Sequence, residues 1–238
     1  MGAVNCKKHV GWSWHEWPIN SVLGDKCFCG EVRLEQQDLG GIRTHKSMKT
    51  LDEIGIHFQT DKASQFSRTY AKPHDYCRHL ERLFEPMRDQ LIKVLEIGVG
   101  GGESVRTWLE YFPNARVFGV DLVSSTNEWN TPGAKTHERY VFSCGNQSDP
   151  KFWKKFIEAY GEFDIVIDDG SHVTKDTITT FNSLWTHVRS GGIYEIEDLN
   201  VMPDLSPFIG AINAKVINGE GNFDSIYFAR ELCVIRKK

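Results

Sequence analysis

The chain has 238 residues, of which 40% are hydrophobic and 25% are charged, and its formal net charge at pH 7 is -4. This length and composition predict one globular domain with room for a small appendage. The absence of a basic excess argues against a nucleic-acid partner. No apolar run reaches the roughly 18 residues of a membrane span and no secretory signal is visible, so we expect a cytoplasmic protein with no membrane partner.

Residues 1–46 differ from the rest of the chain, because they are rich in Trp, His and Cys and show no sustained period. Cys6 and His9, followed by Cys27 and Cys29, offer four ligands for a structural zinc ion, which can fold a short segment. The Cys-x-Cys spacing is tighter than a usual zinc knuckle. The alternative is a packed extension with free thiols, and the sequence leaves both open.

From residue 47 onward, the apolar pattern predicts a second domain, 47–238, in which two helices precede alternating strands and helices. The predicted helices are 47–58, 74–88, 103–112, 149–160 and 174–188, and the predicted strands are 91–98, 115–122, 139–144, 163–169 and 191–199. This alternation predicts an α/β fold with a Rossmann-like, doubly wound and mostly parallel sheet. Residues 212–238 predict two extended runs around a Gly- and Asn-rich turn, which would form an antiparallel C-terminal edge.

The end of the first predicted strand carries a glycine-rich turn, "LEIGVGGGES", in which Gly98 and Gly100 follow Glu96. Ligands of such sheets bind at the carboxyl ends of the strands. Glu103 stands where a dinucleotide fingerprint has its third glycine, so the turn is instead similar to the first motif of S-adenosylmethionine-dependent methyltransferases. Asp121, at the end of the second strand, would accept hydrogen bonds from ribose hydroxyls of either cofactor. The alternative is a glycine-rich turn that binds no ligand.

Four acidic residues follow two later strands: Asp168 and Asp169 in "DIVIDDGSH", and Glu197 and Asp198 in "GGIYEIEDL". Carboxylates crowded at one edge of a sheet repel one another, and a divalent cation removes that repulsion. Oxygen ligands suit magnesium, manganese or calcium. His172 follows in the same loop and is a candidate general base. The alternative is that Asp168 and Asp198 cap helices and that His172 is a surface residue.

Several segments together resemble the metal-dependent sugar O-methyltransferases of macrolide biosynthesis, of the mycinamicin and macrocin type, and the related cephalosporin-hydroxylase-like proteins. These segments are "HFQTDKAS", "LEIGVGGGESVRTWLEYFPNARVFGVDL", "GNQSDP", "DIVIDDGSH" and "GGIYEIEDL". The resemblance extends over residues 50–236 and leaves the N-terminal segment unexplained.

The resemblance implies that Asp169, Glu197 and Asp198 bind magnesium and that His172 and Asp169 are catalytic, with His172 as the general base. It also places S-adenosylmethionine at the carboxyl ends of the strands, with Gln147 near the adenine. The candidate cofactor-binding residues are Thr60, Lys62, Glu96, Gly98, Gly100, Ser104, Asp121, Gln147, Asp149 and Asp168. Among these, Thr60 and Lys62 match a segment that folds over the cofactor in the family.

The chain departs from the family pattern at positions that the resemblance places around the substrate mouth. Gln59 replaces a glycine before Thr-Asp-Lys, Asn146 replaces an acid before Gln147, and the histidine expected a few residues after Ser64 is missing. These departures put the identity of the acceptor in doubt, and not the chemistry.

The sequence thus predicts an S-adenosylmethionine- and magnesium-dependent O-methyltransferase that acts on a hydroxyl of a sugar or another polyhydroxylated small molecule. Two alternatives are a nicotinamide-dependent oxidoreductase on a similar sheet and a binding module with a degenerate methyltransferase scaffold. A homo-oligomer is compatible with the sequence, which does not determine the oligomeric state.

Overall fold

The structure, a computed structural model, describes residues 48–65, 72–122, 128–130 and 136–238. The chain divides into two units, Met1–Met48 and Lys49–Lys238. Every helix and strand of the described residues lies in the second unit. The predicted N-terminal segment lies outside the described residues, and with it the zinc candidates Cys6, His9, Cys27 and Cys29.

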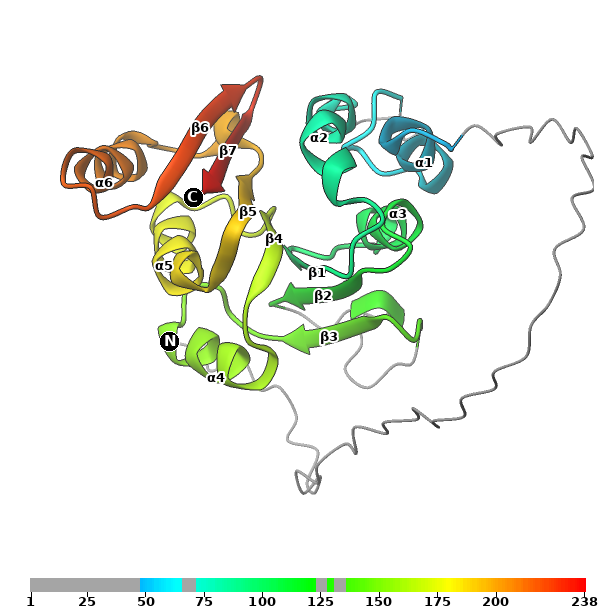
Figure 1. Cartoon of the computed structure of the whole chain (residues 1–238), viewed down its shortest axis with the longest axis horizontal. Coiled ribbons are helices and arrows are strands. Elements are labelled where there is room, and N and C mark those ends of the chain that lie inside the picture. The colour runs from blue at the N-terminus through cyan, green and yellow to red at the C-terminus, as the bar shows by residue number, and fades with distance from the viewer. Residues whose placement is uncertain (1–47, 66–71, 123–127, 131–135) are drawn as a thin grey trace, which may run out of the picture. The chain divides into compact units, whose positions relative to one another are not determined.

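A seven-stranded sheet forms the centre of the second unit, with the strand order β3-β2-β1-β4-β5-β7-β6 (Figure 1). The strands are β1 (Lys93–Ile97), β2 (Arg116–Asp121), β3 (Tyr140–Cys144), β4 (Phe163–Asp168), β5 (Val188–Ile196), β6 (Phe223–Ala229) and β7 (Leu232–Lys237). Strands β1 to β5 pair in parallel, and β7 is antiparallel to both β5 and β6. The predicted doubly wound, mostly parallel sheet with an antiparallel C-terminal edge is confirmed.

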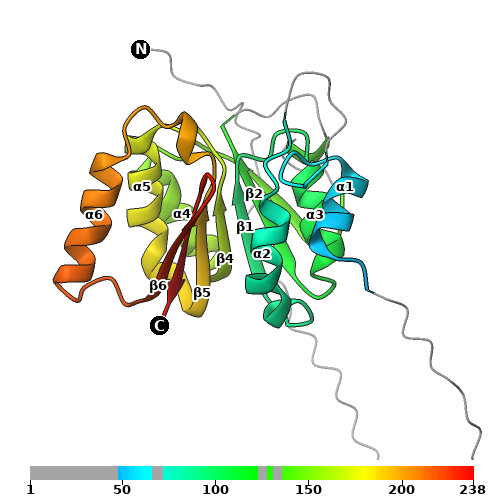
Figure 2. The ribbon, with the colours of Figure 1, turned by 90° about the horizontal axis from the view of Figure 1, so that it is seen from above.

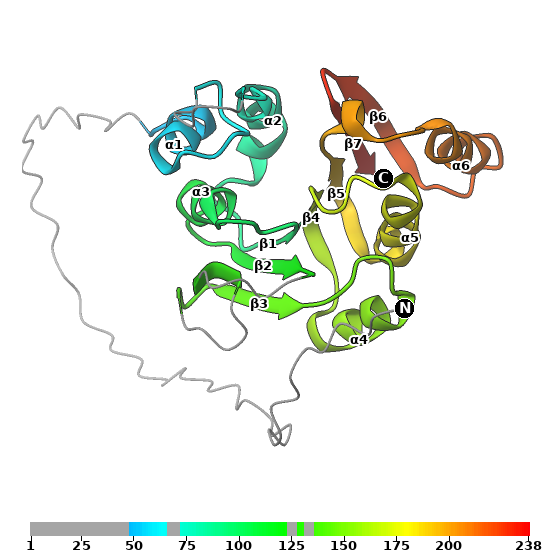
Figure 3. The ribbon, with the colours of Figure 1, turned by 180° about the vertical axis from the view of Figure 1, so that it is seen from behind.

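Helices cover both faces of this sheet, as Figure 2 and Figure 3 show from two sides. The α-helices of the described residues are α1 (Leu51–Phe58), α2 (Tyr76–Phe84), α3 (Glu103–Tyr111), α4 (Pro150–Tyr160), α5 (Thr174–Leu184) and α6 (Ser206–Ile217). Short 3₁₀ helices lie at Glu85–Met87, Glu128–Asn130, Trp185–His187 and Leu199–Val201. Within the described ranges, no helix is long and apolar enough to cross a membrane.

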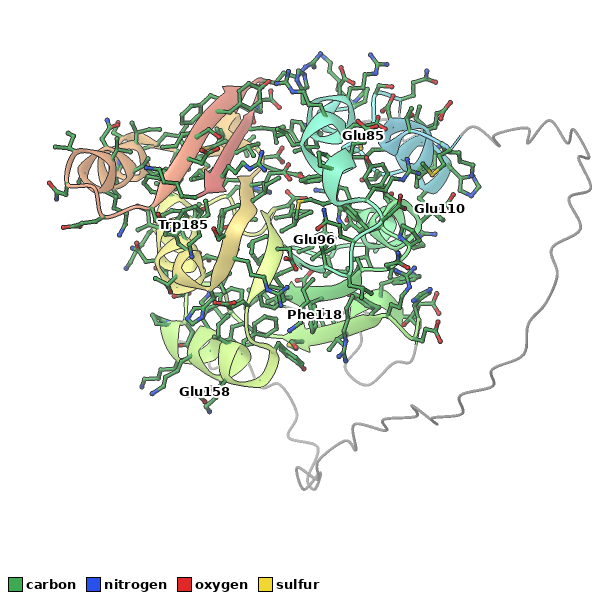
Figure 4. All side chains as sticks on the ribbon, viewed as in Figure 1. Glu85, Glu96, Glu110, Phe118, Glu158 and Trp185 are labelled. Atoms are coloured by element: carbon green, nitrogen blue, oxygen red, sulfur yellow. The ribbon has the colours of Figure 1, made fainter. Side chains whose placement is uncertain are left out.

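Alternation along the strands divides the core into two parts. Val94 packs with side chains of α1, α2 and α3, whereas Leu95 packs with those of α4, α5 and α6. Because successive side chains of a strand point to opposite faces, Glu96 lies on the same face as Val94. Glu195 and Glu197 reach that face in the same way from β5 and from the residue after it. Figure 4 shows Glu96 in the interior of the molecule.

Two of the helices begin at residues whose side chains cap the helix N-terminus. Thr50 caps α1, because its hydroxyl accepts a hydrogen bond from the Glu53 N–H and the Glu53 carboxylate accepts one from the Thr50 N–H. Asp149 caps α4, because its carboxylate accepts a hydrogen bond from the Lys151 N–H, with Pro150 in the first turn. A helix cap is therefore the role that the structure gives Asp149.

The C-terminal tail differs from its prediction. Residues 212–217, which the sequence predicts as extended, form the second half of α6, and the edge strands β6 and β7 are joined by a tight turn at 230–231. Valine and isoleucine favour a strand by propensity, but tertiary packing overrides it. Pro207 stands in the first turn of α6, and Phe208 and Ile212 bury one side of that helix.

Replacing Phe208 by alanine tests this packing, because its ring is 1% exposed and meets Phe181 edge to face with 6.1 Å between ring centroids. We expect Phe208→Ala to lower the free energy of unfolding by about 3 kcal/mol or more. Ile217→Ala is the matched control, since Ile217 is 82% exposed and its loss should change stability by less than about 0.5 kcal/mol. Urea unfolding curves of both variants measure the difference, and equal effects would contradict the assignment.

Candidate functional site

A cavity of about 540 Å³ opens at the carboxyl ends of the parallel strands. It brings together most of the candidate residues predicted from the sequence, namely Gly98, Gly100, Asp121, Gln147, Asp169, His172, Glu197 and Asp198. A second cavity of about 200 Å³ is lined by Thr60, Lys62, Gly98, Gly100, Ser104 and Asp169. Glu96, Asp149 and Asp168 line neither cavity. The predicted site residues thus fall into a group that lines the cavities and a group that does not.

The glycine-rich turn after β1 is fixed from two directions. The Asp121 Oδ2 atom accepts hydrogen bonds from the N–H groups of Val99 and Gly100, each at 3.1 Å. Gly98 has φ +88°, and a Cβ atom on it would lie 1.9 Å from the carbonyl oxygen of Asp169. Only glycine accommodates both the backbone conformation and this close approach. The turn after β1 therefore lies directly against the loop after β4.

Gln147 holds the loop after β4 on its other side. Its side-chain Nε2 donates to the Asp168 carboxylate at 3.1 Å and to the Thr180 hydroxyl at 3.2 Å. Its side-chain Oε1 accepts a hydrogen bond from the Ser171 N–H at 2.6 Å. Its main-chain carbonyl accepts one from the Trp153 indole N–H at 2.8 Å. In this structure the side chain of Gln147 therefore fixes the neighbouring loop, while the residue lines the larger cavity.

The side chains of Asp168 and Asp169 face opposite sides of the sheet, which corrects the expectation that all four acids meet. Asp168 is 3% exposed and faces α4 and α5, where Gln147 and Tyr194 donate hydrogen bonds to its carboxylate. Burial raises the pKa of Asp168 to about 7, although these two hydrogen bonds oppose the shift. Asp169 is the next residue and follows the end of the strand on the opposite side. Neither Asp168 nor Asp198 caps a helix with its side chain.

Lys62, which follows α1, reaches the edge of the sheet where Glu96, Asp169 and Glu197 lie; we call this the acidic edge. Its ammonium forms ion pairs with Asp169, with Glu197 at 2.5 Å, and with Glu96 at 3.9 Å. The Lys62 side chain is 2% exposed. Burial lowers its pKa, but the surrounding carboxylates outweigh that effect and hold the pKa above its usual value. Lys62, predicted only as part of a cofactor cover, is thus the cation that these acids contact.

Glu195 lies on β5, two residues before Glu197, and faces the same side of the sheet. It is fully buried. Burial raises the pKa of Glu195 to about 8, although the charge of Lys62 opposes the shift. Burial likewise raises the pKa of Glu197. Glu195 contributes to the raised pKa of Glu197, because like charges at close range repel.

Asp169, His172 and Asp198 form a group whose candidate ligand atoms all lie within 4.8 Å of one another. The His172 Nε2 atom is 3.9 Å from Asp169 Oδ1 and 3.7 Å from Asp198 Oδ2. Two of the three predicted magnesium ligands thus meet, and His172 takes the place expected for Glu197, whose carboxylate turns toward Lys62. His172 (φ +52°) and Asp198 (φ +57°) both adopt the left-handed backbone region, a strained conformation that is enriched at functional sites.

A second set of side chains meets Asp198 from outside the predicted site. The Tyr76 hydroxyl lies 2.7 Å from Asp198 Oδ1 and 3.2 Å from the Glu231 carboxylate. The His74 Nδ1 atom lies 3.4 Å from Asp198 and 3.2 Å from Glu231. The sequence analysis missed these residues, because 122 positions separate Tyr76 from Asp198 and no motif links them.

The chain is similar in sequence to sugar O-methyltransferases. No family model matches it. It is 34% identical over 155 residues to the L-olivosyl-oleandolide 3-O-methyltransferase of Streptomyces antibioticus, which covers 62% of this chain and 36% of that protein. It is 37% identical over 156 residues to the demethylmacrocin O-methyltransferase of Streptomyces fradiae. That match covers 63% of this chain and 36% of that protein. The chain therefore spans about a third of the length of the curated relatives it matches.

Solved structures agree with these relatives. A methyltransferase of the mycinamycin biosynthetic pathway, in complex with Mg, SAH and mycinamycin VI, matches with a TM-score of 0.67 and 26% identity over 80% of this chain and 54% of that one. A crystal form of the same methyltransferase with Mg and SAH matches with a TM-score of 0.66. The Rossmann-like class I methyltransferase fold is confirmed, and so is the resemblance to macrolide and sugar O-methyltransferases.

Gly98→Ala tests the contact between the glycine turn and the loop after β4. We expect a loss of at least about 1–2 kcal/mol of stability from the left-handed backbone alone, with a further loss from the clash with Asp169. Gly210→Ala is the control, because a Cβ at that helical position meets nothing within 4 Å. Thermal unfolding of both variants checks this, and an unchanged Tm for Gly98→Ala would show that the turn is not held as described.

Glu96→Gln tests the electrostatics of the buried edge. Burial raises the pKa of Glu96 to about 7 from an ordinary value near 4.5, although the charge of Lys62 opposes the shift. Between these two pH values the folded protein keeps a proton that the unfolded chain releases, so wild-type stability falls as pH rises through this window. Below it both states are protonated, and above it both are ionised.

Because glutamine does not titrate, the variant should gain stability relative to the wild type as pH rises from about 4.5 to about 7. Metal-free unfolding curves across this range measure the difference. Parallel pH profiles for the two proteins would show that folding does not raise the pKa of Glu96.

Proposed function

We propose that this chain is an S-adenosylmethionine-dependent, divalent-metal-dependent O-methyltransferase that acts on a hydroxyl of a sugar or another polyhydroxylated small molecule. One observation carries the proposal: a single cavity holds the glycine turn and Asp121 next to the group of Asp169, His172 and Asp198. Such a cavity can place a methyl donor beside a metal-held acceptor. The similarity to enzymes named as sugar O-methyltransferases supports the same reaction.

The acidic edge suits a divalent cation. Asp169 and Asp198 would supply carboxylate oxygens, as hard cations prefer, and Glu197 lines the same cavity. The buried Nδ1 atom of His172 has no hydrogen-bond partner among the described residues, so this histidine is not committed to a structural role. Magnesium is the ion we propose, as in the mycinamycin-pathway methyltransferase solved with Mg.

The glycine turn suits S-adenosylmethionine. Gly98 and Gly100 present backbone without side chains to the larger cavity, and Asp121 lies beside them at the end of β2. Thr60 and Ser104 border the smaller cavity on the other side of the turn. We propose that these residues bind the cofactor, that Gln147 shapes its adenine end, and that Glu96 and Asp168 support the site from below without lining it.

When bound, the cation would supply charge that favours ionisation of the acceptor hydroxyl, and S-adenosylmethionine would supply the methyl group. His172 would accept the hydroxyl proton at Nε2, which faces the cavity near both aspartates. The carboxylates of Asp169 and Asp198 would stabilise the imidazolium that results. The walls of the cavity would align acceptor oxygen and methyl carbon, which is the main source of rate in such a transfer.

Several finer assignments belong to this proposal. The acceptor would enter where Asp61, His74 and Asn146 line the cavity, and Asn146 is one of the departures from the family pattern. Structural zinc at Cys6, His9, Cys27 and Cys29, a cytoplasmic location and a homo-oligomer stay predictions. Calorimetric titration with S-adenosylhomocysteine and with NAD separates the proposal from an oxidoreductase.

His172→Ala and metal removal test the mechanism. We expect His172→Ala to lower the rate of methyl transfer from labelled S-adenosylmethionine to a glycoside panel by about 10²–10⁴-fold, because the base is lost. Its affinity for S-adenosylhomocysteine should stay near the wild-type value. EDTA should abolish transfer, and Mg²⁺ should restore it. His57→Ala is the control, since His57 is exposed and lies outside both cavities. Activity that survives both treatments would refute the mechanism.

A further inference from the structure

Lys62 occupies an unusual position for a lysine. Its side chain is 2% exposed, and its ammonium contacts carboxylates that come from the ends of three neighbouring strands, β1, β4 and β5. Asp169, a proposed metal ligand, and Glu197, which lines the same cavity, are among its partners. Lysine is almost never fully buried unless it is paired, so these ion pairs explain why it is inside.

The main chain around Lys62 is held independently of these ion pairs. The Lys62 carbonyl accepts a hydrogen bond from the Cys77 N–H at 2.9 Å, in the first turn of α2. The Lys62 N–H donates to the Thr60 hydroxyl at 3.4 Å. The ammonium is therefore delivered to the acidic edge by a fixed backbone.

Several carboxyl groups crowd around the Lys62 ammonium at this edge. The Lys62 ammonium forms ion pairs with Glu96, Asp169 and Glu197. Glu195 faces the same side of the sheet. Removing a single cation from such a cluster leaves several carboxylates without compensation, which strongly destabilises a folded protein. Conversely, a cation fixed beside a metal site repels the metal ion.

We propose that the Lys62 ammonium is a built-in counter-cation of the metal site. It holds Asp169 and Glu197 together before a divalent ion binds, and its charge limits the affinity of the site for that ion. Lys62 is thus a positioning residue for the metal ligands. The inference rests on the proposed function, because it concerns the metal ion of that site.

Lys62→Met is the decisive variant, because methionine keeps an unbranched apolar stem and removes the charge. Two effects of opposite sign are expected. The metal-free Tm should fall by more than about 5 °C, because the carboxylates lose their cation. The affinity for Mn²⁺, measured by isothermal titration calorimetry, should rise at least roughly tenfold, because the repulsion is removed. Saturating Mn²⁺ should raise the Tm of the variant more than that of the wild type.

Lys93→Met is the matched control. Lys93 is a partly buried lysine on β1 that donates to the Tyr160 carbonyl at 2.7 Å and lines neither cavity. Its replacement should leave the Mn²⁺ affinity unchanged. If Lys62→Met does not fold, the double variant Lys62→Met with Glu96→Gln is measured instead, because it removes the ammonium together with one of the carboxyl groups that pairs with it.

The outcomes separate this inference from the proposed function. A Lys62 variant that binds Mn²⁺ no more tightly than the wild type, or keeps the wild-type Tm without metal, overturns the inference and leaves the proposed function intact. A wild-type protein that binds no Mn²⁺ contradicts the metal dependence in the proposed function. In that case the inference about Lys62 stands only if Lys62→Met binds Mn²⁺ and has a lower metal-free Tm than the wild type.

Discussion

One interaction ties the described residues together: the ammonium of Lys62 lies among carboxylates at the carboxyl edge of the sheet. A buried ion cluster adds little net stability, but losing one partner is costly because the remaining charges stay buried. Residues 59–65, which follow α1, are therefore anchored to the ends of β1, β4 and β5. The same segment borders the smaller cavity beside the glycine turn. The proposed cofactor site and the proposed metal site thus share one electrostatic support.

The adjacent residues Asp168 and Asp169, at the end of β4, direct their side chains to opposite faces of the sheet. Asp168 is the last residue of β4, and alternation directs it toward α4 and α5, where it binds Gln147 and Tyr194. Asp169 follows the strand and faces Lys62 and His172. Two neighbouring carboxylates therefore serve opposite faces, one fixing the loop after β4 and the other lining the cavity. The two carboxylates still repel, because Asp169 contributes to the raised pKa of Asp168.

The antiparallel edge also contributes to the site. Glu231 lies in the turn between β6 and β7, and it contacts His74 and Tyr76, which both also contact Asp198. Arg230, the other residue of that turn, donates to the Asp75 carboxylate at 3.0 Å. The C-terminal hairpin and the start of α2 therefore hold Asp198 between them. A left-handed backbone at Asp198 is tolerated because these contacts support it.

The amino-acid sequence by itself determined the strand and helix alternation, the glycine turn at Gly98 and the acids that follow β4 and β5. These features are local, since period, turn chemistry and strand ends are written in neighbouring residues. Tertiary structure alone decided that Lys62 is the cation of this edge, that Asp168 faces away from it, and that Tyr76 and Glu231 meet Asp198. It also decided that residues 212–217 are helical. Such outcomes depend on packing and charge between segments far apart in the chain, which local propensity does not encode.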